Sequence, residues 1–156
     1  MNIGIPEKNR GAVAGILNAL LADEYVLYTK TRKYHWNVTG PHFSELHKFF
    51  EAQYEALDQT IDEVAERARA LGKEAFGTLA EFNEHTSLEE NPGKNPDADG
   101  MIEDLLEDHE TVVNHLRRDL KACAEKYDDT GTSDFLTGLM EGHEKMAWML
   151  RSFLEK

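Results

Sequence analysis

The sequence lacks the features that mark several large classes of protein. Its single cysteine, Cys123, cannot form an intrachain disulfide, which suits a reducing compartment such as the cytoplasm. It has no run of about 18 apolar residues, which a membrane-spanning helix requires. It also has no Asn-Gly or Asp-Gly turn between alternating apolar runs, the usual signal of a β-hairpin. We therefore expect a cytoplasmic protein without membrane contact and with one helical domain, residues 1–156.

Positive charge is scarce as well. Seventeen basic residues face 30 acidic ones, which gives a formal net charge of −13, and no basic run occurs anywhere in the chain. Contacts to phosphate supply most of the non-specific affinity for nucleic acid, so we expect no strong DNA binding. An acidic surface instead attracts cations.

The common catalytic motifs are missing too. We find no Gly-x-Ser-x-Gly elbow, no phosphate loop and no dinucleotide-binding fingerprint. Cys123 lies among the apolar positions of a helical pattern and is expected to be a small core residue. The Glu-x-x-His pair of intrachain di-iron bundles is also absent. No glutamate lies three residues before any of His42, His47, His85, His109, His115 and His143.

Helical periodicity dominates what remains. Apolar residues recur at helical spacing, which predicts four long helices at about 9–36, 42–71, 99–127 and from a Thr132 or Ser133 cap to the C-terminus. A capping-box pattern from Thr78 to Glu81 predicts a short helix at 79–84. One long crossover between the second and third long helices is typical of ferritin-like bundles. The predicted fold is therefore an all-α, ferritin-like four-helix bundle.

A polar track runs beside the apolar stripe of the second helix. It consists of His47, Glu51, Asp58, Asp62 and Glu66, and no Lys or Arg joins it before position 69. At about 100° per residue, the two ends of the track share one narrow face of the helix. Carboxylates in a line repel one another, so a counter-charge is expected. Solvent, a basic neighbour and a metal ion all fit this requirement.

The spacing of this track excludes a simple metal site within one chain. The His47/Glu51 pair and the Asp62/Glu66 pair lie about 15 residues apart, or roughly 22 Å along a straight helix. Bonds from a metal to its ligands are only about 2.0–2.2 Å long, so one ion cannot join the two pairs. An antiparallel, two-fold pairing of two copies would bring opposite ends together and create two identical sites.

The spacing does not identify the metal. Imidazole and carboxylate ligands suit iron, manganese or zinc better than calcium. His35, just before the turn into the second helix, is placed to fold back toward His47, although a histidine there also serves to bond the last carbonyls of its helix. A solvated acidic face explains the same spacing, which would make the chain an acidic helical interaction protein without a metal.

Other polar residues receive simpler interpretations. His109 and His143 lie on apolar stripes, and we expect buried, hydrogen-bonded imidazoles rather than ligands. The acidic run of Glu107, Asp108 and Glu110 reads as a solvated face. Two tryptophans, at positions 36 and 148, are expected to pack in the core or anchor an interface.

Three segments of the chain are distinctive. They are Tyr34-His35-Trp36-Asn37-Val38-Thr39-Gly40-Pro41, continuing to His47; Asp62-Glu63-Val64-Ala65-Glu66-Arg67, continuing to Leu71-Gly72; and the ending His143-Glu144-Lys145-Met146-Ala147-Trp148-Met149-Leu150-Arg151. They resemble the Dps family of mini-ferritins, which are named for DNA protection during starvation, and the similarity extends over nearly the whole chain.

This resemblance implies a hollow dodecamer that oxidises Fe(II), preferably with hydrogen peroxide, and stores ferric mineral, with the short middle helix at the two-fold interface. It implies that His35, His47 and Glu51 of one chain, with Asp62 and Glu66 of its mate, bind the iron and carry out catalysis. Manganese or zinc in the same site remains an alternative. Position 51 departs from the family's usual Asp, and the Lys-rich terminal extension of DNA-binding members is missing. The resemblance also suggests that an acidic pore could be lined by Asp128, Asp129 and Asp134, although a solvated turn explains these residues equally well.

Overall fold

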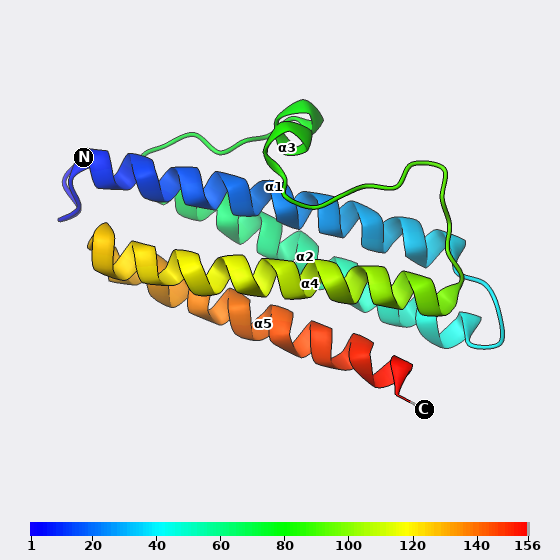
Figure 1. The fold of residues 1–156 in the computed structure, drawn as a ribbon. Helices are drawn as coiled ribbons and strands as arrows, with labels where there is room; N and C mark the ends of the chain where they lie inside the picture. The colour runs from blue at the N-terminus through cyan, green and yellow to red at the C-terminus, as the bar shows by residue number, and fades with distance from the viewer. Residues whose placement is uncertain (156) are drawn as a thin grey trace.

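The protein is a bundle of long helices, seen in a computed structural model that describes residues 1–155, a range without strands. The bundle is formed by α1 (Glu7–Asn37), α2 (Phe43–Ala70), α4 (Ala98–Lys121) and α5 (Thr130–Leu154), and the short α3 (Leu79–His85) lies in the crossover (Figure 1). The predicted all-α four-helix bundle with a long crossover is confirmed. Between residues 1 and 155, every helix is too short or too polar to span a lipid bilayer.

Two helical hairpins pack together around one apolar core. Figure 1 shows α1 beside α2 and α4 beside α5. The buried apolar stripes that sequence periodicity predicts meet between the hairpins, and they include Leu17, Leu21, Leu27, Phe50, Leu57, Leu105, Leu116, Leu136 and Leu150. Cys123 is fully buried among them, as expected.

Gly72 ends α2, as the sequence predicted. Its amide donates to the Arg69 carbonyl at 2.9 Å, and the next amide, of Lys73, donates to the Ala68 carbonyl at 3.2 Å. This pair of bonds closes the last turn and requires a left-handed residue, which Gly72 supplies with φ of +74°. The helix is continuous up to this point, so nothing bends the polar track on its surface.

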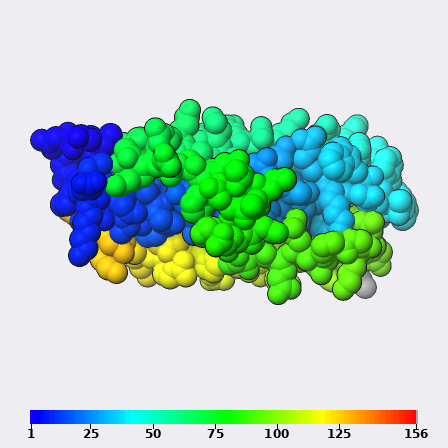
Figure 2. Space-filling model, turned by 90° about the horizontal axis from the view of Figure 1, so that it is seen from above, coloured from blue at the N-terminus to red at the C-terminus, as the bar shows by residue number. Residues whose placement is uncertain are grey.

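The crossover is fixed to the outer side of α1, where Figure 2 shows it lying across the molecule. The predicted capping box is present in α3, where Thr78 and Glu81 bond each other's backbone amides. The Phe82 ring stacks on Tyr25 of α1 at 4.4 Å between centroids. The Asp23 carboxylate accepts hydrogen bonds from the segment that follows α3, including one of 2.8 Å from the Thr86 hydroxyl.

Polar links join the two hairpins, and one of them corrects the sequence analysis. The Asp108 side chain was expected to be solvated but is only 7% exposed. Its carboxylate lies 2.6 Å from the buried Lys30 ammonium of α1, which also lies 3.0 Å from the Asp104 carboxylate. Charge counting along α4 missed this contact because the partner is far away in sequence. Burial raises the pKa of Asp108 to about 6, although Lys30 opposes that shift.

The turn between α4 and α5 gives a second correction. α4 continues into one π-helical turn, Ala122–Lys126, and α5 starts at Thr130. Its cap is Asp129, whose carboxylate accepts from the Thr132 amide at 2.9 Å and from the Thr132 hydroxyl at 2.6 Å. The predicted Thr132 or Ser133 cap is therefore wrong. Asp129 is 2% exposed and also pairs with Arg67 at 3.2 Å, so its carboxylate is already engaged within the chain.

Candidate metal centre

His35 and His47 form a closed pair where α1 turns back into α2. The Nδ1 atom of His35 lies 2.7 Å from the His47 carbonyl oxygen, and the Nδ1 atom of His47 lies 2.8 Å from the His35 carbonyl oxygen. The two rings stack with centroids 3.8 Å apart and planes 18° from parallel. The sequence left two interpretations of His35 open, and the structure has the one in which His35 folds back toward His47.

These hydrogen bonds determine which nitrogen of each ring is available. A carbonyl oxygen can only accept, so Nδ1 of each ring must carry the proton and donate it. In the neutral imidazole, the Nε2 atom then keeps its lone pair. An imidazole whose other nitrogen donates to a backbone carbonyl is the usual form of a metal-bound histidine. His35 and His47 are therefore both held in the ligating tautomer.

Glu51 lies one helical turn beyond His47 on the same face of α2 and is partly exposed. Tyr54 lies beside the histidine pair, because its ring meets that of His35 edge to face at 5.3 Å between centroids. Its pKa is raised, first by desolvation and then by the Glu51 charge. One carboxylate and two imidazoles are thus the candidate donor group at this end of α2.

Sequence reasoning missed a cation beside this group. The Arg32 guanidinium donates to the Tyr28 hydroxyl at 2.6 Å and lies over the Tyr54 ring at 4.7 Å and the Trp36 ring at 5.3 Å. The helical spacing of Tyr28, Arg32 and Trp36 was the available signal. Trp36 itself is 65% exposed in the single chain, so it is not a core residue.

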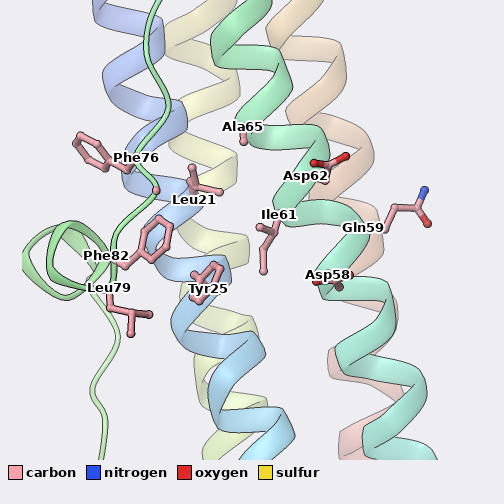
Figure 3. A pocket seen from close by; sticks show the side chains of 11 residues that line it. Leu21, Tyr25, Asp58, Gln59, Ile61, Asp62, Ala65, Phe76, Leu79 and Phe82 are labelled. Atoms are coloured by element: carbon pink, nitrogen blue, oxygen red, sulfur yellow. The ribbon is translucent and has the colours of Figure 1, made fainter.

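The second half of the candidate centre lies farther along α2. Asp62 and Glu66 are exposed, and Asp62 lines a pocket of about 530 Å³. In Figure 3, Asp62 and Asp58 project from α2, while Leu79 and Phe82 of the crossover lie on the other side of the pocket. The pocket is open to solvent and contains both carboxylates and apolar side chains.

One chain does not bring the two halves together. α2 is a single α-helix from Phe43 to Ala70, so His47/Glu51 and Asp62/Glu66 stay roughly 22 Å apart. Within residues 1–155, no three His, Cys, Asp or Glu side chains are grouped closely enough to hold an ion. The structure places His35 with His47, and Asp62 apart from them. The assignment of these five residues as ligands stays a prediction.

Comparison with known proteins agrees with this architecture. The ferritin-like domain family matches residues 14–156. A low temperature-induced protein of Nostoc sp., described as uncharacterised, is 46% identical over 155 residues, covering 99% of this chain and 87% of that protein. DNA protection during starvation protein 2 of Bacillus anthracis is 40% identical over 144 residues, covering 92% of this chain and 97% of that protein.

A solved structure extends the comparison to three dimensions. The Dps protein of Vibrio cholerae O1, described as a member of a broad superfamily of ferritin-like diiron-carboxylate proteins, has a TM-score of 0.93 at 30% identity, with 99% and 97% of the two chains covered. The bundle, its crossover and the matched domain define a ferritin-like protein. Within that class, the chain belongs to the Dps family.

Proposed function

We propose that this protein binds Fe(II), oxidises it with hydrogen peroxide at centres shared between two copies of the chain, and stores the ferric product inside a hollow dodecamer. The observation that carries the proposal is the reciprocal bonding of His35 and His47, whose Nδ1–H groups donate to each other's carbonyl oxygens. Two imidazoles fixed with free Nε2 atoms beside Glu51 form half of a nitrogen–carboxylate site that suits iron.

A second copy supplies the other half of the site. In an antiparallel, two-fold pairing of α2 helices, Asp62 and Glu66 of the mate meet His35, His47 and Glu51, and each dimer forms two equal centres. The pocket contains Asp62 and the side chain of Leu79, which is 72% exposed, and we expect such a pairing to cover it.

The chemistry assigns simple roles to these residues. Imidazole Nε2 atoms and carboxylate oxygens hold Fe(II), and the carboxylates favour the more highly charged ferric product. In the overall reaction, two Fe(II) lose one electron each and one hydrogen peroxide accepts both as its O–O bond breaks. With two waters, the products are two ferric oxyhydroxide units and four protons. The net charge of −13 attracts the incoming cation.

The decisive experiment combines anaerobic Fe(II) titration, peroxide addition followed by absorbance, and a measurement of particle mass. We expect two Fe(II) consumed per peroxide and a mass of twelve chains. His47→Ala should slow oxidation strongly and leave the mass unchanged. His42→Ala is the matched control, because His42 is exposed near the same turn and its Nδ1 makes only a 3.9 Å contact with Glu45; it should behave like the unaltered protein.

Other results would replace the proposal. Zinc or manganese bound at the same stoichiometry, without iron oxidation, would define a metal-holding protein. A monomer that takes up no metal would define an acidic helical interaction protein. A gel shift with DNA at physiological salt, lost at higher salt, would add a DNA-binding role that the composition disfavours.

A further inference from the structure

A chain of three buried polar residues crosses the centre of the bundle, away from the candidate metal centre. Glu24 of α1 and His109 of α4 are 0% exposed, and His143 of α5 is 1% exposed. The Nε2 atom of His143 lies 2.7 Å from a Glu24 carboxylate oxygen, and its Nδ1 atom lies 2.9 Å from the Nδ1 atom of His109. The sequence analysis predicted buried, hydrogen-bonded histidines here, and both are confirmed.

This hydrogen-bonded chain of three residues joins the two helical hairpins. Glu24 belongs to the α1–α2 hairpin, and both histidines belong to the α4–α5 hairpin (Figure 1). Elsewhere the hairpins are linked by Lys30 with Asp104 and Asp108, and by Arg67 with Asp129. Those links lie nearer the surface, because Asp104 and Arg67 have side chains 26% and 29% exposed. All three members of the imidazole–carboxylate chain, by contrast, are at most 1% exposed.

Burial limits how many protons this chain can hold. A dry core strongly disfavours net charge, so the favoured form is neutral overall. In that form one proton lies between Glu24 and the His143 Nε2 atom, one lies between the two Nδ1 atoms, and His109 is neutral. Within residues 1–155, the second Glu24 oxygen and the His109 Nε2 atom have no hydrogen-bond partner. Nothing described there compensates a second proton.

We infer that the Glu24–His143–His109 chain is a pH-sensitive lock, which holds the hairpins together in its neutral form and loosens when acid favours a second proton on His109. The reason lies in the difference between folded and unfolded states. In the folded protein the pKa of His109 is well below its ordinary value of 6.5, because of burial first and the His143 charge second. An unfolded His109 therefore binds more protons below about pH 6.5. The contribution of His109 to stability is therefore complete above that pH and falls as the pH decreases, by up to about tenfold in the unfolding equilibrium constant per pH unit.

Few other polar or titratable groups lie around the lock, and their effects on the pH dependence of stability can be separated from that of His109. α1 contributes Glu24, α5 contributes His143, and the buried polar residue of α2 is the uncharged Gln53. On α4 the neighbouring Asp108 faces Lys30 instead. The pKa of Asp108 is raised to about 6, so its contribution has the opposite sign and falls as pH rises through that value. Variants at position 109 must therefore be compared with the unaltered protein at each pH.

The test is urea unfolding followed by far-UV circular dichroism between about pH 7.5 and about pH 5, at one protein concentration. His109→Gln keeps a hydrogen-bonding group toward His143 but cannot titrate. We expect it to remove up to about a tenfold change per pH unit below pH 6.5. His115→Gln is the matched control, because His115 is on the same helix, is 32% exposed and lies 3.6 Å from Asp23. It should keep the lock's pH dependence, and equal slopes in the unaltered protein and His109→Gln would overturn the lock.

A second measurement covers the case in which His109→Gln does not fold. Hydrogen–deuterium exchange at the histidine ring carbon reports the protonation of each imidazole in the unaltered, assembled protein. His109 should exchange as a neutral, protected ring down to about pH 5, while His115 exchanges as an accessible one. A His109 that titrates near its ordinary value in the folded protein would refute the lock. Neither experiment depends on iron chemistry.

Discussion

His35 and His47 are bonded to each other twice, since each ring donates a proton to the carbonyl oxygen of the other residue, at 2.7 Å and 2.8 Å. The backbone that closes the α1–α2 turn thus also orients both rings. If the two rings bind iron as proposed, stability and metal binding are coupled at these two positions, and a suitable substitution separates them.

His35→Asn is that substitution. The asparagine amide can take over the Nδ1–H bond to the His47 carbonyl, but it has no nitrogen at the Nε2 position. We expect a loss of stability below about 1 kcal/mol, whereas His35→Ala should lose about 1–2 kcal/mol with its hydrogen bond. Thermal unfolding measures this difference. Iron oxidation should be strongly reduced in both variants, and normal oxidation in His35→Asn would remove His35 from the ligand set.

Glu51 is tested by charge and by length. Glu51→Gln keeps the size of the side chain and removes its charge, so Fe(II) affinity should fall by at least about tenfold. Glu51→Asp keeps the charge and shortens the side chain by one methylene, which should change the occupancy of one iron position more than overall affinity. Titration calorimetry under anaerobic conditions measures both the Fe(II) affinity and the occupancy of the iron positions. If Glu51→Gln binds Fe(II) normally, Glu51 is not a ligand.

Arg67 should stabilise the α4–α5 turn from a distance. Its guanidinium lies 3.2 Å from the Asp129 carboxylate and 2.9 Å from the Thr132 hydroxyl. Arg67→Ala leaves a buried carboxylate without its cation, and we expect a loss of about 2 kcal/mol because Arg67 is itself partly exposed. Arg69→Ala, which removes an exposed bond to the Lys73 carbonyl, is the control. It should lose less than about 0.5 kcal/mol in the same denaturation assay.

Asp108→Asn should change the pH dependence of stability. The folded pKa of Asp108 is raised to about 6 from 3.8, so the folded protein binds the extra proton between those values. Its contribution is present below the unfolded pKa and is lost as pH rises through about 6. Relative to the unaltered protein, Asp108→Asn should therefore lose less stability between about pH 4 and about pH 6. Urea midpoints across that range provide the measurement.

Leu79 tests the shared centre from outside the ligand set. It is 72% exposed, lines the pocket beside Asp62 and belongs to α3. Leu79→Glu places a further negative charge against an acidic face, so particle mass and iron oxidation should both fall while helix content stays constant. Leu79→Met, of similar size, should preserve both. Retention of full oxidation by a monomeric Leu79→Glu would show that one chain is sufficient.

Structural features that follow from the periodicity of the sequence were predicted correctly. The choice among several similar residues for one role was not. The buried stripes and the Gly72 stop follow from spacing and backbone freedom alone. The α5 cap was misplaced because Asp129, Thr132 and Ser133 are all good caps, and only the partner Arg67 distinguishes Asp129. The burial of Asp108 depends on Lys30, a contact between distant segments that no local pattern encodes.

In the candidate metal centre, too, helical spacing was predictive and contacts between distant segments were not. Helical spacing put His47 and Glu51 on one face and separated them from Asp62, and the straight α2 agrees with that. The reciprocal bonds of His35 and His47 depend on the path of the turn between their helices, so they were not foreseeable. Arg32 was overlooked because its neighbours are aromatic rings rather than carboxylates.

The unbroken course of α2 has a consequence for the newly synthesised chain. If the ligand assignment holds, a freshly made subunit carries two incomplete sets of donors and is chemically silent toward ferrous iron. Activity would then increase with the square of subunit concentration at the lowest concentrations, since two chains must meet before any centre exists. Formation of ferric mineral would be confined to assembled particles, which already enclose a cavity in which the mineral can be deposited.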